Sequence, residues 1–202
     1  MKLYYSPGAC SMASHIALRE AGLTFDLEKV DLRAHRTEKN EDFAQINPKG
    51  YVPALRLDNG EILTEGPALL QYIADQKPAA GLAPAAGTMD RYRLMEWLNF
   101  VSTEVHKQFS PLFNPAITPE WREAQVSRLA GRFDYLAKQL TGRPYLMGER
   151  YSVVDAYLFT VLGWCGMLKI DLGRWPTLQE YLGRIAARPA VKAAMKAEGL
   201  SK

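Results

Sequence analysis

The chain has 202 residues, of which 48% are hydrophobic and 23% charged, a balance typical of a globular protein with a substantial core. Its 25 basic and 22 acidic side chains are interspersed and leave a net charge of +3, which argues against nucleic acid as a partner. The two cysteines lie far apart and form no disulfide framework, and no apolar run approaches the roughly 18 residues of a membrane span. Because Pro7 also interrupts the short apolar start, we expect no signal peptide and a cytoplasmic location.

The first 22 residues predict a strand, a turn and a helix with a cysteine at its start. Residues 2–5 are apolar and aromatic, residues 6–8 are a Ser-Pro-Gly turn signal, and helical spacing then continues to Gly22. Cys10 falls in the first helical turn, where free N–H groups and the helix dipole favour a thiolate, so we expect a reactive thiol. The residue three positions after Cys10 is Ala13, which has no thiol to resolve a mixed disulfide. If Cys10 acts as a reactive thiol, it therefore needs an external thiol such as glutathione as its partner. The competing interpretation is a buried, unreactive cysteine.

The rest of the first half alternates between strand and helix signals. A second strand is expected to end near Val30, followed by a charged loop over residues 31–40 and a short helix over 41–46. Residues 47–53 are rich in Pro and Gly, and an Asn-Gly pair between residues 54–57 and 61–63 indicates a hairpin. We expect Thr64 to cap a helix over residues 65–74. This order predicts a small α/β domain with one mixed sheet.

The second half is expected to be entirely helical. Residues 78–87 are rich in Ala, Pro and Gly and predict a linker between a domain of residues 1–80 and a domain of residues 87–202. Helices are expected over residues 90–109, 119–140 and 153–168, and two more are expected to begin at Trp175-Pro176 and Arg188-Pro189.

Three features of the helical half bear on its function. On the helix over residues 90–109, the helical spacing places four polar side chains on one face: Asn99, Thr103, His106 and Lys107. A lone histidine on a helix is more often incidental than functional. Ser152 and Asp155 form a capping box, so Asp155 is interpreted as a folding residue. Cys165, inside an apolar run, is expected to pack inertly.

Several of these features together resemble a known enzyme family. They are the order of elements, Cys10 after Tyr-Ser-Pro-Gly, the Val52-Pro53 pair, and Glu65-Gly66 after Thr64. The combination resembles the glutathione S-transferases, most closely the bacterial beta class, and the resemblance covers essentially the whole chain. It implies a thioredoxin-like α/β domain at the N-terminus and an all-α domain at the C-terminus.

The resemblance also implies roles in the first domain. Pro53 would follow a cis peptide bond, so that the Val52 backbone pairs with the cysteinyl part of glutathione. Glu65 and Gly66 would bind the γ-glutamyl end at a helix start. His35 stands where relatives usually carry a lysine that reaches the glycyl carboxylate, and a histidine there would be a weaker, pH-dependent anchor.

In the second domain, the residues that match the family's glutathione site are Asn99, Thr103, Glu104, His106 and Lys107. Family members use the residue at Glu104 to touch glutathione held by the neighbouring subunit, which implies a homodimer. The resemblance favours Cys10 as the catalytic partner of the glutathione sulfur, with His106 assisting as a hydrogen-bond donor or base. Tyr5 and Ser11 compete with Cys10 for this role, because other classes use tyrosine or serine in this region.

We therefore expect the chain to be an enzyme of detoxification that conjugates the thiol of reduced glutathione to small hydrophobic electrophiles. Glutathione is its co-substrate, and no metal, bound cofactor, nucleic acid or membrane is expected. Because Cys10 can also form a mixed disulfide with glutathione, the alternative is a glutathione-dependent thiol–disulfide oxidoreductase or reductive dehalogenase. A third alternative is a binding module that kept the fold and lost the chemistry; intact Cys10, Glu65 and His106 argue against it.

Overall fold

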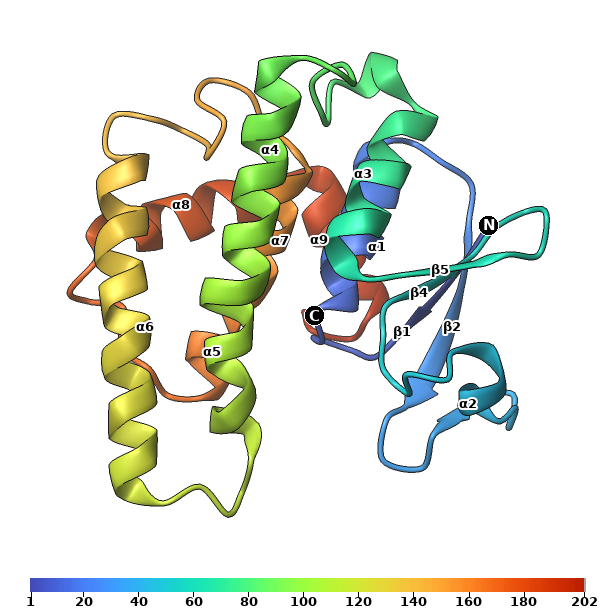
Figure 1. Cartoon of the computed structure of the whole chain (residues 1–202), viewed down its shortest axis with the longest axis horizontal. Helices are drawn as coiled ribbons and strands as arrows, with labels where there is room; N and C mark the ends of the chain where they lie inside the picture. The colour runs from blue at the N-terminus through green and yellow to red at the C-terminus, as the bar shows by residue number, and fades with distance from the viewer. Residues whose placement is uncertain (202) are drawn as a thin grey trace. The chain divides into compact units, whose positions relative to one another are not determined.

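The computed structural model describes residues 1–201 and divides the chain into two compact units. The first unit comprises Met1–Ala83 and the segment from Arg188 onward, and the helical unit comprises Pro84–Ala187. Figure 1 labels the elements of both units.

The first unit is built on a mixed sheet of five strands in the order β3-β2-β1-β4-β5. In chain order its elements are β1 (Lys2–Tyr5), α1 (Ser11–Glu20), β2 (Asp26–Asp31), β3 (Arg36–Thr37), α2 (Phe43–Ile46), β4 (Ala54–Arg56), β5 (Ile62–Thr64), α3 (Gly66–Gln76), the 3₁₀ turn η1 (Pro78–Ala80) and α9 (Pro189–Ala197). β1 pairs in parallel with β2 and antiparallel with β4, and the remaining neighbours are antiparallel. The predicted mixed sheet is therefore confirmed, and its topology is thioredoxin-like.

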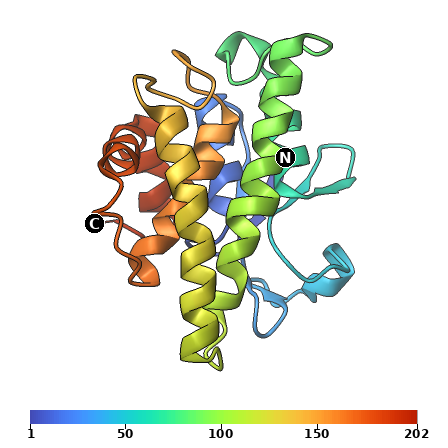
Figure 2. The same cartoon turned by 60° about the vertical axis from the view of Figure 1, so that its left-hand side comes forward.

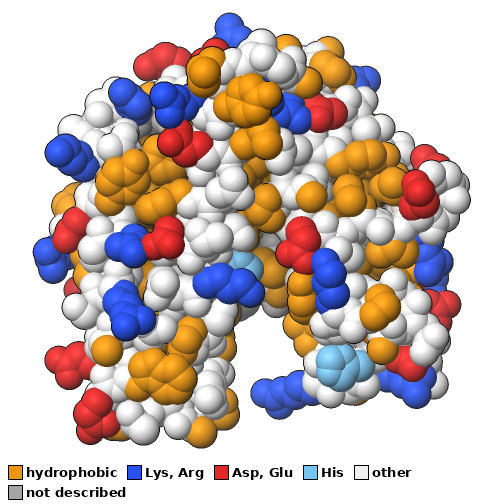
Figure 3. Space-filling model, viewed as in Figure 1, with side chains coloured by type: hydrophobic (Ala, Val, Ile, Leu, Met, Phe, Trp, Pro, Cys, Tyr) orange, Lys and Arg blue, Asp and Glu red, His pale blue; other side chains and the backbone are white. Residues whose placement is uncertain are grey.

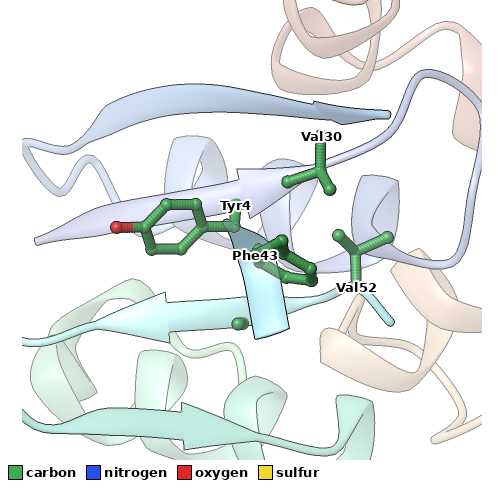
Figure 4. Packing of buried hydrophobic residues seen from close by; sticks show 5 residues of the cluster. Tyr4, Val30, Phe43 and Val52 are labelled. Carbon is green, nitrogen blue, oxygen red and sulfur yellow. The ribbon is translucent and has the colours of Figure 1, made fainter. Parts of the chain in front are cut away.

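Two faces of this sheet are covered differently. Helices α1 and α3 pack against each other, and they contact β1 and β5 respectively. On one face, the buried side chains of Tyr4, Val30, Phe43 and Val52 gather into a cluster (Figure 4). Phe43 belongs to α2, so this short helix is fixed to the sheet by a fully buried ring. The cluster also anchors the side chain of Val52, which precedes β4.

Helix α9 packs against α1 in the first unit, although it follows the helical unit in sequence. The Arg188 guanidinium makes two hydrogen bonds to the Glu20 carboxylate. Beyond α9, Glu198 accepts hydrogen bonds from the Gly8 N–H at 2.9 Å and from the buried ring of His15 at 2.8 Å. The sequence predicted one continuous domain over residues 87–202, because the helical periodicity of α9 gives no sign of which helix it contacts.

The helical unit contains a long, interrupted helix followed by three further helices. Its elements are α4 (Met89–Phe100), the π-helical segment η2 (Val101–His106), α5 (Lys107–Phe109), the 3₁₀ turn η3 (Ser110–Phe113), α6 (Pro119–Leu140), α7 (Val153–Met167) and α8 (Pro176–Ala186). α6 runs alongside the segment formed by η2 and α5 in both views of the chain (Figures 1 and 2). The predicted helices over 119–140 and 153–168 and the two predicted helix starts at proline are confirmed to within a residue.

Helix α7 is buried over most of its length and begins with the predicted capping box. The Asp155 carboxylate is fully buried and accepts hydrogen bonds from the N–H groups of Leu146 and Ser152, the Ser152 hydroxyl and the Tyr181 hydroxyl, at 2.9–3.1 Å. Burial raises the pKa of Asp155 to about 6, while these hydrogen bonds act in the opposite direction. Asp155 therefore ties the start of α7 to the preceding loop and to α8.

Two expectations for the first half are wrong. Thr64 does not cap α3; it ends β5, and the N-cap is Glu65. The strand continues to Thr64 because this residue pairs with Ala54 across the hairpin. The expected loop over residues 31–40 contains the two-residue strand β3, which pairs with the end of β2.

The surface agrees with the charge pattern of the sequence. On the face of the molecule in Figure 3, basic and acidic side chains are interspersed among hydrophobic and uncharged ones. Within residues 1–201, every helix is either too short or too polar to cross a bilayer.

Replacing Asp155 with alanine should lower the free energy of unfolding by about 2–4 kcal/mol, because it leaves buried N–H and O–H donors without their acceptor. Glu123→Ala, an exposed change on α6, is the control and should change stability by no more than about 0.5 kcal/mol. Urea unfolding followed by circular dichroism measures both. Equal stabilities of the two variants would contradict a structural role for Asp155.

Candidate active site

Cys10 lies directly before α1 and is its N-cap residue, as the sequence predicted. Its side chain is half-buried, and it does not cap the helix. The Sγ–H group instead donates a hydrogen bond to the backbone carbonyl of Val52, with Sγ and the carbonyl oxygen 3.2 Å apart. The thiol therefore lies at the meeting point of a helix N-terminus and the loop over residues 47–53.

This loop is fixed at both ends. The Val52–Pro53 peptide bond is cis, which confirms the expectation drawn from the family resemblance. The Val52 side chain is buried in the cluster of Figure 4, so its carbonyl has little freedom to turn away from Cys10. Upstream, the buried Asn47 side chain donates a hydrogen bond to the Tyr51 carbonyl at 2.7 Å.

Glu65 lies on the other side of the loop, at the start of α3. Its φ of +70° and ψ of +113° place it in a region that residues other than glycine rarely adopt, a form of strain that occurs mostly at functional sites. The exposed Glu65 carboxylate accepts hydrogen bonds from the Tyr51 hydroxyl at 2.7 Å and from Lys49 Nζ at 2.5 Å. The hydrogen bonds to Glu65 raise the pKa of Lys49 and the pKa of Tyr51. Gly66 follows as the first helical residue, and its N–H points outward from the helix end.

Two residues that hold the Glu65 carboxylate, Lys49 and Tyr51, were not predicted from the sequence. The only sequence signal was their place beside Gly50 in the loop rich in Pro and Gly. Gly50 has a φ of +74°, and a side chain there would also meet His35, whose Cε1 atom would lie 3.2 Å from an added Cβ. The exposed His35 is thereby next to the same loop. All six predicted first-unit residues lie on or beside it: Cys10, His35, Val52, Pro53, Glu65 and Gly66.

The two competitors for the role of Cys10 are less well placed. The Ser11 hydroxyl is fully buried and is engaged by Ser6, whose N–H it accepts at 3.2 Å and whose carbonyl it faces at 3.3 Å. Tyr5 is also nearly buried, and this burial raises the pKa of its phenol. Of the three side chains, Cys10 is the most accessible.

The predicted residues of the helical unit lie on the interrupted helix. Asn99 is near the end of α4, Thr103, Glu104 and His106 are in η2, and Lys107 begins α5. The wider π-helical turn of η2 shifts these side chains relative to the regular helical spacing expected from the sequence.

Most of these side chains reach the surface. Asn99, Thr103 and Lys107 are exposed, and the Thr103 hydroxyl donates to the Asn99 carbonyl at 3.0 Å. Glu104 is half-exposed and accepts two hydrogen bonds from the Arg132 guanidinium, at 2.6 and 2.9 Å.

His106 differs from its neighbours because its ring is largely enclosed. Nδ1 lies 2.7 Å from the hydroxyl oxygen of Tyr157, and the ring packs edge-on against Trp164 with centroids 4.9 Å apart. Burial, helped by the charge of Lys107, lowers the pKa of His106 to about 4. The imidazole is therefore neutral at physiological pH.

The other cysteine has the surroundings of a packing residue. Cys165 on α7 is 1% exposed, and burial raises the pKa of its thiol to about 12. It stays protonated near neutral pH. Among residues 1–201 there is no group of three or more His, Cys, Asp or Glu side chains that could hold a metal ion.

Comparison with known proteins agrees with this arrangement. The family model described as glutathione S-transferase, N-terminal domain, matches residues 8–76, and the C-terminal domain model matches residues 100–189. The chain is 44% identical over 200 residues to glutathione S-transferase GstA of Escherichia coli O157:H7, covering 99% of this chain and 100% of GstA. The chain belongs to the glutathione S-transferase family.

Comparison with solved structures indicates the class within this family. A bacterial beta-class glutathione S-transferase from Sphingomonas chungbukensis is 52% identical with a TM-score of 0.97, and a sphingomonad glutathione S-transferase in complex with glutathione is 54% identical with a TM-score of 0.96. Each comparison covers 100% of both chains. The predicted resemblance to the bacterial beta class and the predicted fold are confirmed.

Because His106 is partly buried and neutral, the stability of the protein should fall in mild acid. The unfolded chain binds this proton with a pKa near 6.5 and the folded chain only near 4, so the unfolded state gains the proton first as the pH falls. On account of His106, the free energy of unfolding should drop by about 2 kcal/mol between pH 8 and pH 5.

Urea unfolding of the parent and of His106→Gln across this range isolates the effect, because other groups contribute equally to both. The variant should lose about 2 kcal/mol less than the parent between the two pH values. Parallel pH profiles would contradict a depressed pKa.

Proposed function

We propose that this chain catalyses the conjugation of reduced glutathione to small hydrophobic electrophiles. The observation that carries the proposal is the loop over residues 47–53, which brings Cys10, the cis Val52–Pro53 pair and Glu65 together in a member of the glutathione S-transferase family. A glutathione complex of a relative that is 54% identical supports the same ligand.

In this proposal, the first unit binds the tripeptide. The Val52 backbone pairs with the cysteinyl residue, and the Gly66 N–H with the α3 dipole receives the γ-glutamyl carboxylate. Glu65 receives the ammonium group, with Lys49 and Tyr51 fixing its carboxylate before glutathione arrives. His35 reaches the glycyl end. This preorganisation reduces the entropy that is lost on binding.

The chemistry requires a glutathione thiolate held next to an electrophile. Cys10 stabilises the sulfur at the N-terminus of α1, where the helix dipole favours negative charge. His106 is neutral, so it acts as a hydrogen-bond donor rather than as a cation. Asn99, Thr103 and Lys107 provide further polar contacts to glutathione. Positioning the thiolate and the electrophile together then removes the entropic cost of their encounter.

The helical unit offers apolar surface for the electrophile. Phe113 is 47% exposed and packs edge-on against Trp164 at 5.4 Å between ring centroids, and Met167 is 59% exposed one turn further along α7. We assign the electrophile to this surface, with the first unit as the glutathione-binding domain.

The proposal extends to a cytoplasmic homodimer that serves in detoxification. Neither cysteine forms a disulfide within the described residues, which suits a reducing compartment. Met89 and Tyr92 on α4 are 69% and 56% exposed, and large exposed apolar side chains favour a protein interface. Glu104 would reach the glutathione of the partner subunit, with Arg132 orienting its carboxylate.

Conjugation of 1-chloro-2,4-dinitrobenzene to glutathione tests the proposal directly. The parent should catalyse it, and glutathione should raise its melting temperature. Glu65→Gln should raise KM for glutathione about 10-fold with little change in kcat, because a charge-assisted hydrogen bond made equally in the ground and transition states contributes about 1.5 kcal/mol or more.

Glu41→Gln, an exposed change elsewhere in the first unit, is the matched control and should leave KM unchanged. A parent protein that neither conjugates nor is stabilised by glutathione would overturn the proposed function.

A further inference from the structure

The ring of His106 is held by two side chains of one helix. Tyr157 and Trp164 are seven residues apart on α7 and therefore lie two turns apart on the same face. Both rings meet the imidazole edge-on, with centroids 5.8 Å away for Tyr157 and 4.9 Å away for Trp164. Tyr157 is only 2% exposed, so its hydroxyl is fixed in place by packing. The π-helical segment η2, which carries His106, packs against α7.

The direction of the hydrogen bond between the two residues follows from their acidities. Its length is 2.7 Å between Tyr157 Oη and His106 Nδ1. A phenol with a pKa near 10 is a much stronger donor than a neutral imidazole N–H, and an imidazole nitrogen with a pKa near 6.5 is a much stronger acceptor than a phenol oxygen. The favoured arrangement is therefore O–H donating to Nδ1. A neutral imidazole then carries its single proton on Nε2.

We propose that Tyr157 is a positioning residue that fixes the orientation and tautomer of His106, so that the ring presents its Nε2–H group as a donor to the glutathione sulfur. The tautomer stands on the geometry of the helical unit alone, whereas its use in catalysis rests on the proposed function.

This arrangement decides between the two roles open to His106. With Nδ1 occupied by the Tyr157 hydroxyl and Nε2 protonated, the ring has no free lone pair and does not act as a base. It stabilises a thiolate by donating a hydrogen bond, without taking a proton from it. The low pKa of His106, about 4, keeps the ring in this neutral form.

Nitrogen NMR of the protein with ¹⁵N-labelled histidine tests the tautomer without any ligand. The chain has three histidines, and the spectrum of His106→Ala identifies the signals of His106. His15 is an internal reference, because Arg19 Nε donates to its Nε2 at 2.8 Å and its proton must lie on Nδ1. His106 should show the opposite pattern, with an unprotonated Nδ1 and a protonated Nε2.

Tyr157→Phe removes only the hydroxyl and should convert His106 to a mixture of the two tautomers. Tyr135→Phe, on the 44% exposed Tyr135 of α6, is the matched control and should leave the His106 signals unchanged. A protonated Nδ1 in the parent, or unchanged His106 signals in Tyr157→Phe, would overturn the proposal.

Kinetics test whether Tyr157 acts through His106. Tyr157→Phe should lower kcat for conjugation about 10-fold, on the scale of the loss of one hydrogen bond that orients His106, with KM for glutathione unchanged. In a His106→Ala background the same change should have no further effect. Equal losses in both backgrounds would overturn the positioning role, since Tyr157 would then act independently of His106.

The two proposals fail in different ways. If the parent lacks transferase activity but shows the expected tautomers, the proposed function fails and the assignment of the His106 proton by Tyr157 stands. If the parent conjugates glutathione but has Nδ1 protonated, the function stands and the inference fails.

Discussion

The contact between the Cys10 thiol and the Val52 carbonyl joins two stretches of chain that are 42 residues apart. One is the start of α1, where unpaired N–H groups accumulate, and the other is the loop that contains the cis peptide bond. The contact persists because the Val52 side chain belongs to the buried cluster over the sheet. The Cys10 thiol is therefore positioned by the core of the first unit, and Glu65 is fixed to the same loop through Tyr51 and Lys49.

The two cysteines show how the surroundings, rather than the residue type, decide the chemistry of a thiol. Cys10 is half-buried at a helix N-terminus, whereas Cys165 is enclosed near the end of the most apolar helix, where burial raises the pKa of its thiol. The same contrast separates the histidines. His106 is held neutral between aromatic rings, and His35 is exposed beside Gly50. In each pair, one side chain is more enclosed than the other.

Much of this arrangement could be predicted from the sequence because its signals are local. The strand before Cys10, the Asn-Gly hairpin, the proline helix starts and the capping box at Asp155 depend on neighbouring residues and are all found in the structure. The cis bond before Pro53 came from the family resemblance, since proline alone does not fix it.

The features that were missed depend on contacts between distant residues. Thr64 was expected to be a cap because its chemistry suits one, but pairing across the hairpin keeps it in β5. No periodicity in the sequence indicates that Lys49 and Tyr51 bind the Glu65 carboxylate. The same holds for the packing of α9 against α1. The π-helical segment that contains His106 leaves no signature in the residue pattern, although it carries the ring that contacts Tyr157.

Mass spectrometry after exposure of the folded protein to glutathione disulfide tests the central claim most directly, namely that Cys10 is a reactive thiol open to glutathione. Attack by the Cys10 thiolate would form a mixed disulfide and release one glutathione thiolate. The account predicts a single glutathionyl adduct on Cys10 and none on Cys165, retained in Cys165→Ala and lost in Cys10→Ala. An unmodified Cys10, or modification at Cys165 alone, would contradict it.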